Sequence, residues 1–403
     1  MGPWGSLVIL LAWGASDLSS NLNGPTISCF HVIIEENDFT NVKVDTFKTV
    51  LNICFIEDKV MTKDKILIIA DQQVDSVLTS ADYISTRLTE LKQPHILLRL
   101  SELPLKKSSL SVYYDRGEQQ IILNSGASHV NLTEEVKSVL FWHPGIQESI
   151  KNNFAGKDRD FFLGEWGNFF KGIYLSLQDR FWMNPYPQTI TYQDKVFQLK
   201  LAQQLGFHIP STMITTSLKE AQEHFTAAHY NIIYKPFTQV FWHESTTDGE
   251  SIYALYTNII DKNDLKEENA DYATPSIFQE YVEKSIELRV VCVGSTIMAC
   301  EIHSQQSERS KYDWRKYDFE NTPYLIHTLP KDIEDLCRQY LDRLHLTYGS
   351  IDLILTPDNK YVFLELNPNG QFGFIEEMTK LPITENICRM LIAGSTTYEK
   401  KSW

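Results

Sequence analysis

The chain has 403 residues, and its 37 Lys and Arg stand against 52 Asp and Glu, so its formal net charge at pH 7 is −15. This acidic balance argues against a broad nucleic-acid-binding face, because such a face needs clustered basic side chains to neutralise phosphates. A content of 43% hydrophobic and 22% charged residues is typical of globular proteins and rules out a disordered or collagen-like chain. The length is sufficient for two or three domains.

The cysteines and the N-terminal region bear on the location of the protein. The six cysteines include no C-x-x-C pair and no histidine lies at zinc-ligand spacing, so we expect no disulfide framework, no zinc site and a cytoplasmic protein. The apolar run at residues 7–13 is too short to span a bilayer, so we expect no membrane partner. Residues 1–60 show little periodic order, and we treat them as an extension of uncertain status.

Residues 61–181 show the alternation of strands and helices that is typical of an α/β domain. The tetrapeptide Asp115-Arg116-Gly117-Glu118 lies between two alternating segments and predicts the turn of a hairpin. The expected elements are a strand at 66–70, a helix at 80–91, a strand at 95–98, hairpin arms at 111–114 and 120–123, and helix-type sequence from about 146 to 181.

Residues 182–403 again mix strands and helices, and no long linker separates them from the preceding part. Apolar spacing predicts a helix over 195–205 that ends at Gly206, and Ser217-x-x-Glu220 is a capping box that predicts the start of another helix. A strongly amphipathic helix is expected over 333–344. The expected strands cover residues 231–235, 276–282, 288–293, 296–302, 350–355 and 361–367.

The last two strands form a hairpin that carries oxygen-bearing side chains. Glu365 and Asn367 are two residues apart, so both leave the same face of their strand. Leu364 and Leu366 are expected on the opposite face. The pattern therefore predicts one polar and one apolar side for the final strand.

A third oxygen donor lies on the preceding strand. A short turn at residues 357–358 would pair Asp352 with Phe363 and bring Asp352 to the face of Glu365. Mg²⁺ prefers oxygen ligands and is usually held by one or two carboxylates together with nucleotide phosphates. Because acids that interrupt apolar strands are costly to bury unpaired, we favour a metal site over the alternative of solvated surface acids.

Two lysines and a polar strand end precede this hairpin. Lys195 starts a helix and Lys235 ends an apolar strand, and two such lysines can hold triphosphate oxygens, although each alone is typical of a surface charge. Residues 279–282, Gln-Glu-Tyr-Val, can offer backbone groups to an adenine edge. Glu287 and Arg289 share one face of the next strand, where the acid can accept from ribose hydroxyls and Arg289 can point to phosphates.

Taken in order, these residues resemble the signature of the ATP-grasp superfamily, over about residues 182–395. The runs Trp182-Met-Asn-Pro185, Gly206-x-x-Ile-Pro210 and Ile302-His-Ser-Gln305 followed by Asp313-Trp-Arg315 further resemble the peptide-maturing ligases of the microviridin (graspetide) type. With the preceding α/β part, the resemblance covers about residues 62–395. The residues that match the superfamily signature are Lys195, Lys235, Gln279, Glu280, Tyr281, Val282, Glu287, Arg289, Arg315, Asp352, Glu365 and Asn367.

The resemblance implies an ATP-grasp fold of the α/β (α+β) class, with the nucleotide between two antiparallel sheets. It also implies an N-terminal α/β pre-ATP-grasp domain at residues 61–181 and an ATP-grasp domain at residues 182–403. The second domain would divide into a central lid subdomain at about 211–282 and a C-terminal subdomain at 283–403.

The resemblance also implies an ADP-forming ligase. Such an enzyme phosphorylates side-chain carboxylates of a ribosomally made precursor peptide and joins them to Lys amines or Ser/Thr hydroxyls of the same peptide. ATP, Mg²⁺ (or Mn²⁺) and a leader-bearing peptide are the implied cofactors and partners, and relatives suggest a homodimer. The implied roles are nucleotide binding by Lys195, Lys235, Gln279, Glu280, Tyr281, Val282 and Glu287, catalysis by Arg289 and Arg315, metal binding by Asp352, Glu365 and Asn367, and substrate contact by Ser304, Gln305 and Asp313.

Two segments depart from the family pattern, and two other functions stay open. Residues 238–251 contain a single glycine, Gly249, where the family loop over the phosphates is often glycine-rich. Residues 141–145 match the family's Trp-rich segment only loosely. The alternatives are a ligase that adds free amino acids to a protein or peptide, and a non-catalytic relative that binds nucleotide or peptide. A buried charged cluster argues against the last, because a chain released from catalysis has no physical need to keep it.

Overall fold

The computed structural model describes residues 9–13, 28–32, 63–70, 80–142, 158–228, 231–237, 241–246, 249–254, 257–261, 265 and 273–400. The chain divides into two compact units, Met1–Met61 and Thr62–Trp403. In the first unit, strand β1 (Ile9–Trp13) pairs antiparallel with strand β2 (Ser28–Val32). Most of the expected extension, and parts of the segments 141–145 and 238–251, lie outside the described residues. Within the described ranges, no helix has the length and apolar character needed to cross a membrane.

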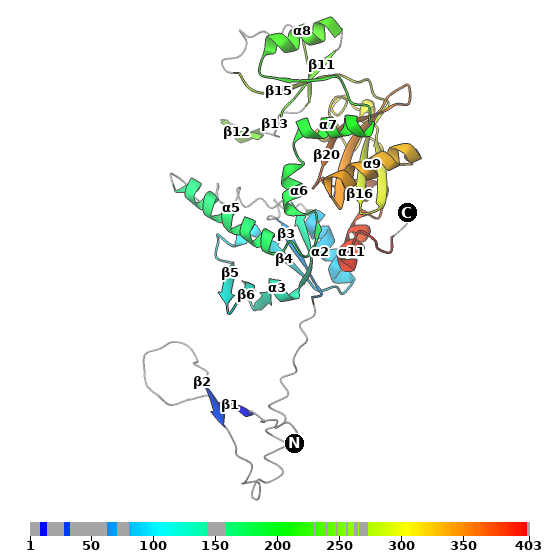
Figure 1. Cartoon of the computed structure of the whole chain (residues 1–403). Coiled ribbons are helices and arrows are strands. Elements are labelled where there is room, and N and C mark those ends of the chain that lie inside the picture. The colour runs from blue at the N-terminus through cyan, green and yellow to red at the C-terminus, as the bar shows by residue number, and fades with distance from the viewer. Residues whose placement is uncertain are drawn as a thin grey trace, which may run out of the picture. The chain divides into compact units, whose positions relative to one another are not determined.

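The second unit begins with a parallel sheet in the order β4-β3-β8-β9, covered by helices on both faces (Figure 1). Its elements are β3 (Lys65–Ala70), α2 (Ser80–Glu90), β4 (His95–Arg99), β8 (Val136–Trp142), α5 (Arg159–Ser176), β9 (Phe181–Met183) and, from the end of the chain, α11 (Ile383–Ala393). Ile66 and Ile68 pack towards α2 and α11, whereas Leu67 and Ile69 pack towards α5. Because both faces are covered, the β3 sequence is apolar throughout instead of alternating.

A small antiparallel sheet is attached to this domain in the order β5-β6-β7. Its strands are β5 (Ser108–Asp115), β6 (Glu118–Ser125) and β7 (Ser128–Asn131), with the short helices η2 (Leu100–Glu102) and α3 (Leu132–Glu135) on either side in sequence. The expected hairpin is confirmed. Its turn consists of Arg116 and Gly117, with φ values of 49° and 86°, which match the left-handed conformation that a two-residue hairpin turn requires.

Two helices follow, α6 (Tyr186–Thr191) and α7 (Lys195–Leu205). The expected bounds of α7 are confirmed. The Asp194 side chain caps its first turn by accepting from the Phe197 N–H at 2.8 Å, and Gly206 ends it with a φ of 99°. Lys195 is therefore held at the first position of a well-defined helix.

A central antiparallel sheet follows in the order β10-β15-β11-β14, with a separate hairpin of β12 and β13. The elements are β10 (Thr212–Thr215), α8 (Leu218–Ala228), β11 (Ile232–Lys235), β12 (Phe241–Thr246), β13 (Gly249–Ala254), β14 (Asn258–Ile260) and β15 (Ser276–Glu280). Phe225 of α8 packs against Ile232 and Phe278, so α8 covers one face of this sheet. The other face carries the polar side chains described below.

The predicted capping box of α8 is only half formed. The Ser217 hydroxyl accepts from the Glu220 N–H at 3.2 Å, as expected. The Glu220 carboxylate instead accepts from the Thr215 hydroxyl at 3.1 Å, and the hydroxyl oxygen of Thr215 accepts from the Ser217 N–H at 2.9 Å. A preceding threonine therefore takes the place that the Glu220 side chain has in a full capping box.

The C-terminal sheet is antiparallel in the order β18-β17-β16-β19-β20. Its elements are β16 (Ile286–Val293), β17 (Thr296–Ile302), η5 (Ser304–Gln306), η6 (Trp314–Lys316), β18 (Tyr324–His327), α9 (Lys331–Leu344), β19 (Tyr348–Leu355), β20 (Tyr361–Asn367) and α10 (Gly373–Thr379). Tyr340 and Leu344 of α9 pack against Leu288 and Val290 on one face, as the amphipathic pattern predicts. Val291 and Val293 point to the other face and join the core that contains α11 and α2.

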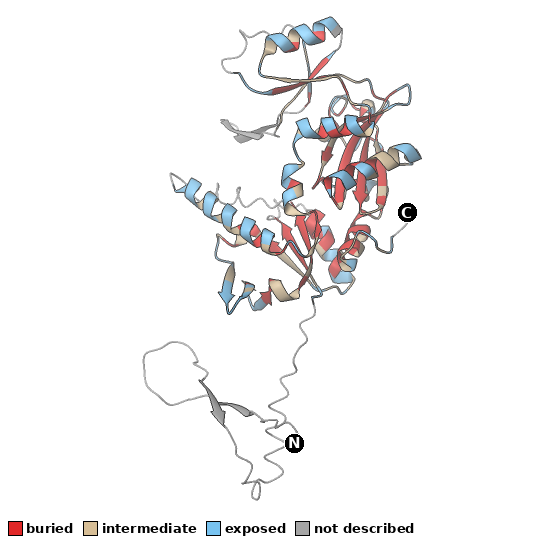
Figure 2. Ribbon diagram, in the orientation of Figure 1, coloured by how far each residue is buried: buried red, intermediate tan, exposed pale blue. Residues whose placement is uncertain are grey.

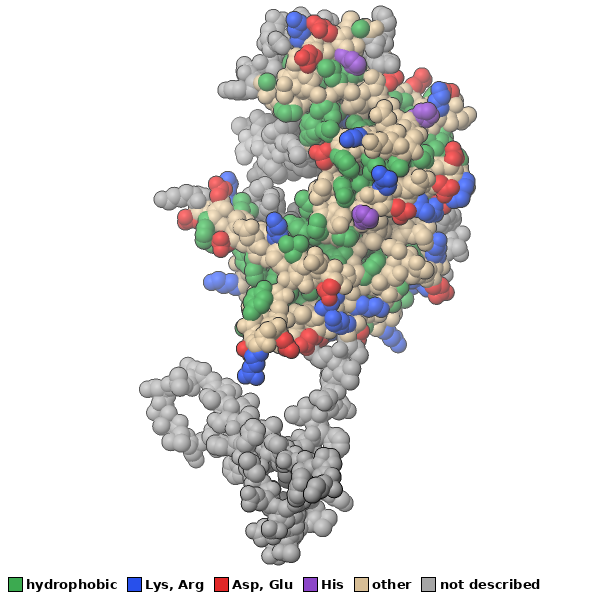
Figure 3. Space-filling model, viewed as in Figure 1, with side chains coloured by type: hydrophobic (Ala, Val, Ile, Leu, Met, Phe, Trp, Pro, Cys, Tyr) green, Lys and Arg blue, Asp and Glu red, His purple; other side chains and the backbone are tan. Residues whose placement is uncertain are grey.

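The buried residues follow the two large sheets, and charged residues remain outside them. Figure 2 shows that the strands of the parallel sheet and of the C-terminal sheet are largely buried, whereas the outer surfaces of α5, α7 and α8 are exposed. On the face drawn in Figure 3, basic and acidic side chains are interspersed. The buried polar residues of the C-terminal sheet are therefore the exceptions that point to a site.

Candidate functional site

A cleft lies between the central sheet and the C-terminal sheet and encloses about 860 Å³, part of which is open to solvent. Its apolar lining residues Pro210, Ile233, Val282, Ile354 and Leu364 are called the apolar end below. A group of its charged lining residues, Lys195, Lys235, Asp313, Arg315, Asp352 and Glu365, is called the charged end. Glu280, Lys284 and Glu287 also line the cleft. A cleft with apolar walls and a few convergent polar groups is the usual form of a small-molecule site.

The register of the final hairpin differs from the expected one. Asp352 pairs with Glu365 and not with Phe363, which pairs with Leu353 instead. A β-bulge at this point leaves Leu364 without a partner residue on β19, and its side chain lines the cleft instead of facing away. The conclusion that Asp352 and Glu365 share a face is nevertheless correct, because residues directly opposite in a sheet point the same way.

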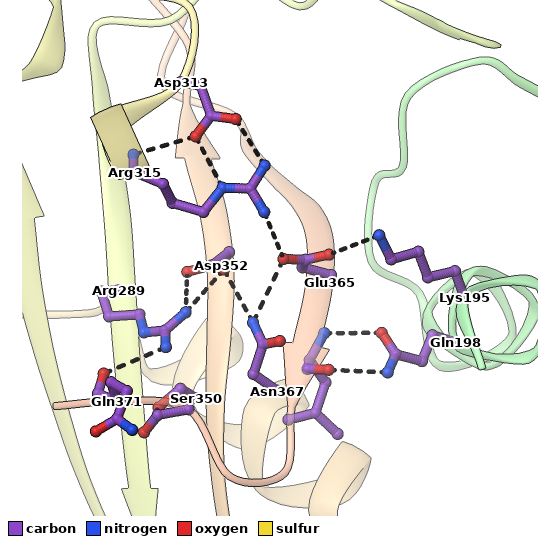
Figure 4. Close-up of polar contacts among 12 residues, drawn as sticks. Lys195, Gln198, Arg289, Asp313, Arg315, Ser350, Asp352, Glu365, Asn367 and Gln371 are labelled. Carbon is purple, nitrogen blue, oxygen red and sulfur yellow. Dashed lines mark hydrogen bonds and ion pairs between the residues drawn. The ribbon is translucent and has the colours of Figure 1, made fainter. Parts of the chain in front are cut away.

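The three expected metal ligands lie together on this hairpin (Figure 4). Asn367 Nδ2 donates to Asp352 Oδ2 at 3.3 Å and to Glu365 Oε1 at 3.4 Å. Burial raises the pKa of Asp352. Burial also acts to raise the pKa of Glu365, but nearby cations, foremost Lys195, outweigh it and lower this pKa. The pKa values of the two neighbouring acids therefore move in opposite directions, because burial prevails at Asp352 and the nearby cations prevail at Glu365.

Asp352, Glu365 and Asn367 are the donors that this hairpin provides for a divalent cation. Within the described ranges, no group of three or more His, Cys, Asp or Glu could hold a metal by itself. The two carboxylates with Asn367 suit Mg²⁺, which commonly takes few protein ligands and completes its shell with nucleotide phosphates and water. The Asn367 amide would have to turn over to coordinate through oxygen, because its Nδ2 now faces both acids. These residues fit a nucleotide-dependent metal site.

Glu365 is surrounded by cations from three different segments. Lys195 Nζ lies 3.7 Å from Glu365 Oε2 and donates to the Pro236 carbonyl at 2.9 Å. Arg315 Nη1 lies 4.0 Å from Glu365 Oε1. Lys235 acts on Glu365 electrostatically from the end of β11. Three cations therefore converge on this one carboxylate, and such an arrangement can also bind an anionic ligand.

Asp313 orients Arg315. Arg315 Nε donates to Asp313 Oδ1 at 2.8 Å and Nη2 donates to Oδ2 at 2.6 Å, which is a bidentate pair. The Thr257 N–H donates to Asp313 Oδ2 at 3.0 Å. Although burial acts to raise it, Arg315 and the backbone donors lower the pKa of Asp313 to about 2. Asp313 is therefore a stable counter-charge that aims Arg315 into the cleft.

Lys235 is the one cation of this group whose pKa moves towards neutrality. Burial is the main cause, and the positive charges of Arg315 and Lys195 add to it, while Glu365 acts in the opposite direction. The result is a pKa of about 8. A phosphate group placed beside Lys235 would stabilise its charged form.

Comparison of the sequence with known proteins does not assign the whole chain to a family. The sequence matches no protein-family model. Among curated proteins it is similar to the ubiquitin ligase complex F-box protein UFO1 of Saccharomyces cerevisiae, with 27% identity over 99 residues, or 23% of this chain. That match spans only 14% of the length of the yeast protein, so it carries no conclusion about the whole chain.

Solved structures are similar over most of the chain. The Chryseobacterium gregarium RiPP-associated ATP-grasp ligase, solved with ADP and a leader and core peptide, is 28% identical, with a TM-score of 0.73 over 82% of this chain and 97% of that one. The macrocyclase MdnC from Microcystis aeruginosa MRC, solved with the precursor peptide MdnA, is 24% identical, with a TM-score of 0.70 over 82% of this chain and 99% of that one. This chain has the ATP-grasp fold. The expected fold class and the resemblance to peptide-maturing ATP-grasp ligases are thereby confirmed.

In this ATP-grasp fold, Arg289 is held by Asp352 and by the loop that contains Gln371. Its Nη1 donates to both carboxylate oxygens of Asp352 at 2.9 Å, and its Nη2 donates to the Gln371 carbonyl at 3.3 Å. Its guanidinium lies 5.6 Å from the centre of the Trp314 ring. The Gln371 side chain accepts from the Ser80 hydroxyl of α2 at 2.6 Å, so the N-terminal domain contacts the loop that supports Arg289.

Ser304 and Gln305 lie behind the cleft wall of the ATP-grasp fold. Ser304 is buried and its hydroxyl donates to Glu287, whose other carboxylate oxygen accepts from Lys284 Nζ at 2.8 Å. Gln305 Nε2 donates to the Lys311 carbonyl at 2.7 Å. Neither residue is part of the cleft lining, whereas Glu287 and Lys284 are. Ser304 therefore positions Glu287, whereas Gln305 holds the backbone at Lys311, and a direct contact of either residue with substrate stays a prediction.

Residues 279–282 line the cleft as expected, although some of their backbone groups already form hydrogen bonds within the protein. The Glu280 N–H donates to the Ser211 carbonyl and the Tyr281 N–H donates to the Asn231 carbonyl, both at 2.8 Å. Beyond β15, the chain at Val282 leaves the sheet and lines the apolar end. An adenine edge could therefore form hydrogen bonds with only some of the backbone groups of residues 279–282.

Gln198 is a site-supporting residue whose role sequence reasoning missed. Its Nε2 donates to the Leu366 carbonyl and its Oε1 accepts from the Leu366 N–H, both at 2.8 Å (Figure 4). Leu366 lies between Glu365 and Asn367 on the edge strand β20, so the amide pairs with this strand as a neighbouring strand would. Gln198 follows Lys195 by one helical turn, but only the tertiary structure shows what it faces.

Proposed function

We propose that this chain is an ADP-forming ligase that activates side-chain carboxylates of a ribosomally made precursor peptide with ATP and joins them to Lys amines or Ser/Thr hydroxyls of that peptide. The main support is a charged end with three cations and an acid-acid-amide set, in a fold whose Chryseobacterium relative was solved with ADP and a leader and core peptide. The activity requires no enzyme nucleophile, because phosphate becomes the leaving group.

The cleft suggests one orientation for ATP. The apolar end has the apolar character that suits a planar base, and Lys195, Lys235 and Arg315 of the charged end would contact the triphosphate. Asp352, Glu365 and the Asn367 amide would hold Mg²⁺, which supplies charge neutralisation at the phosphates.

The reaction then has two balanced steps. A substrate carboxylate oxygen attacks the γ-phosphorus, the bond to the β–γ bridging oxygen breaks, and ADP leaves. An amine or hydroxyl then attacks the acyl carbon, loses its proton, and expels phosphate. Arg315 and Lys235 stabilise the charge that develops on the transferring group, and Arg315 is already aimed by Asp313.

The experiment measures peptide mass and ADP together. A leader-bearing precursor-like peptide is incubated with the protein and Mg-ATP, with Glu365→Gln as the inactive variant and Glu320→Gln, an exposed acid outside the cleft, as the matched control. We expect loss of one water per cross-link and one ADP per water with the wild type and the control, and neither with Glu365→Gln. Fragmentation then identifies the acceptor.

Other outcomes separate the alternatives. ADP release with an unchanged peptide mass would indicate ligation to another acceptor, such as a free amino acid. Nucleotide binding without ADP release or mass change would indicate the non-catalytic relative. We also propose a cytoplasmic protein, since Cys292, Cys300, Cys337 and Cys388 are buried and free. A homodimer is proposed by analogy and is tested by light scattering of the purified protein.

The domain division is likewise a proposal. We propose that the ligase consists of the N-terminal α/β domain and the ATP-grasp domain, with residues 1–60 as an appended extension. The start of the second compact unit at Thr62 supports this boundary. A chain that begins at Met61 should keep the mass change and the ADP yield of the full-length protein.

A further inference from the structure

Asn184 is a buried asparagine directly after strand β9, in the run Trp182-Met-Asn-Pro185 to which the proposed function gives no role. Strand β9 pairs parallel with β8, so Asn184 lies at the edge of the parallel sheet where the carboxyl ends of the strands meet. In open α/β sheets this carboxyl edge is where ligands usually bind. The contacts of Asn184 therefore show what this edge holds in the present chain.

The side-chain amide of Asn184 is fully used by the C-terminal sheet and the loop that follows it. Asn184 Oδ1 accepts from the Thr347 N–H at 2.7 Å and from the Tyr348 N–H at 2.8 Å. Its Nδ2 donates to the Tyr348 carbonyl at 2.7 Å and to the Pro368 carbonyl at 2.8 Å. Turning the amide over would set donor against donor and acceptor against acceptor, so its orientation is fixed.

These contacts lie at one end of the hairpin that carries the proposed metal ligands. Tyr348 is the first residue of β19, and Pro368 directly follows Asn367, the last residue of β20. In the sheet, Asn367 pairs with Ser350, which is close to Tyr348 on the same strand. One amide thus holds both strands at the end where Asn367 lies. A shift of the Asn367 backbone would disturb the bond between Asn184 and the next carbonyl.

The loop of residues 368–371 is also held beyond its first residue. Tyr348 Oη donates to the Gly370 carbonyl at 2.5 Å. The Gln371 side chain accepts from the hydroxyl of Ser80, the first residue of α2, at 2.6 Å. Together with the bond from Asn184, these contacts hold the loop at its start, its middle and its end.

Aromatic packing buries this contact between the parallel sheet and the C-terminal sheet. The ring of Trp142, the last residue of β8, lies 5.3 Å from the ring of Tyr348 and 5.7 Å from the ring of Phe372, edge to face in both cases. All three residues are buried, so a hydrogen bond lost here leaves polar groups that water does not readily reach. The carboxyl edge of the parallel sheet therefore serves as a rigid support for the 368–371 loop.

We propose that Asn184 is a positioning residue: by holding the Pro368 carbonyl, it fixes Asn367 and the loop that contacts Arg289, and so sets the geometry of the Mg²⁺ and phosphate site. The inference rests on the proposed ATP-dependent function. Asn184 lies outside the cleft lining, so its effect passes through the residues that it holds. Groups that orient a metal ligand commonly change metal affinity by about ten- to a hundredfold.

The experiment measures ATP binding to the full-length protein by calorimetry over a range of Mg²⁺ concentrations. Asn184→Asp keeps the acceptor for the two N–H groups but places an oxygen against the Pro368 carbonyl. We expect this variant to bind ATP without Mg²⁺ as the wild type does, and to require Mg²⁺ at about tenfold higher concentration. In the ADP assay, kcat should fall while the KM for the peptide stays close to that of the wild type.

A matched control separates this effect from a general loss of stability. Asn386 of α11 is equally buried, and its Nδ2 donates to the carbonyl of another proline, Pro382, at 2.8 Å. Asn386→Asp should lower the unfolding temperature without changing the Mg²⁺ requirement. Asn184→Ser, which has a shorter and uncharged side chain, provides the same test if the aspartate variant is poorly folded. Thermal unfolding of each variant reports whether it is folded.

Each outcome bears on a definite claim. An unchanged Mg²⁺ requirement in a folded Asn184 variant would overturn the positioning role and leave the proposed ligase intact. An equal rise in the Asn386→Asp variant would do the same, because loss of stability alone would then explain the effect. A wild type that shows neither Mg²⁺-dependent binding of ATP nor ADP formation would overturn the proposed function and this inference together.

Discussion

At the charged end of the cleft the ionised side chains are paired with one another, whereas at the apolar end the buried oxygen of Gln279 has no partner among the described residues. Asp313 holds Arg315, and Asp352 holds Arg289. The charged end is thus largely preorganised by the chain, while the apolar end keeps a buried acceptor that no described residue pairs. Removing one partner at the charged end leaves a buried charge, which is the costlier defect.

The largest effect is expected for the Arg289–Asp352 pair. Asp352→Asn leaves the buried Arg289 guanidinium without its counter-charge and removes a proposed metal ligand. We expect the free energy of unfolding to fall by about 3–5 kcal/mol and ADP formation to be abolished. Urea titration and an ADP assay measure both quantities.

Asp358→Asn is the matched control, because Asp358 lies in the turn of the same hairpin and pairs with Lys360 at the exposed surface. Its free energy of unfolding should stay close to that of the wild type. Similar losses in the two variants would contradict the view that the charged end depends on paired buried charges.

The loop that supports Arg289 should tolerate no added atoms. A Cβ at Gly370 would lie 2.5 Å from Arg289 Nη2 and 2.5 Å from Ser350 Cβ. We expect Gly370→Ala to lower the free energy of unfolding by about 1–3 kcal/mol and to reduce turnover by moving Arg289. Gly172→Ala on α5, where nothing lies within 4 Å of the added atom, should instead stabilise the protein slightly. Equal stability of the two variants would show that the Gly370 loop moves freely.

The next effect concerns the strand that carries the proposed metal ligands. Gln198→Leu removes both hydrogen bonds to Leu366, so we expect β20 to shift and the Mg²⁺ dependence of ADP formation to move to about tenfold higher concentration. Gln203→Leu, at an exposed position of the same helix, is the control. A loss of stability without any change in Mg²⁺ dependence would show that Gln198 supports the fold alone.

The smallest effect is the pH dependence that follows from Lys235. Its pKa of about 8 lies below the ordinary value of 10.5, so the unfolded chain binds more protons between these values and stability should rise with pH in this window. Affinity for ATP should move the other way, falling about fivefold between pH 8 and pH 9, because the neutral amine no longer attracts phosphate.

Calorimetry at several pH values measures this fall in affinity. Lys235→Arg serves as the control, since guanidinium stays charged throughout this range. An equal decline in the arginine variant would assign the pH dependence to another group.

The local patterns of the sequence predicted most elements and the contents of the site. The helix at 195–205 and the final hairpin were predictable because capping, apolar spacing and turn residues act over a few residues. The partner of Asp352 was predicted two residues wrong, because the turn is one residue longer than expected and a bulge adds another residue that alternation cannot reveal. The position of Ser304 behind Glu287 was also not predictable, since these two residues lie on different elements, 17 positions apart in the sequence.

The sequence alone, through its residue types, its short-range periodicity and its resemblance to ATP-grasp ligases, led to the class of the fold and to the predicted phosphate and metal ligands, whose binding roles stay predictions. Only the tertiary structure decided which acid faces which cation, that Gln198 pairs with the edge of β20, and that Gln279 keeps an unpaired oxygen at the apolar end. These are relations between segments far apart in the sequence, and they arise only when the packing of the sheets excludes water and leaves each buried polar group with the partners that the fold provides.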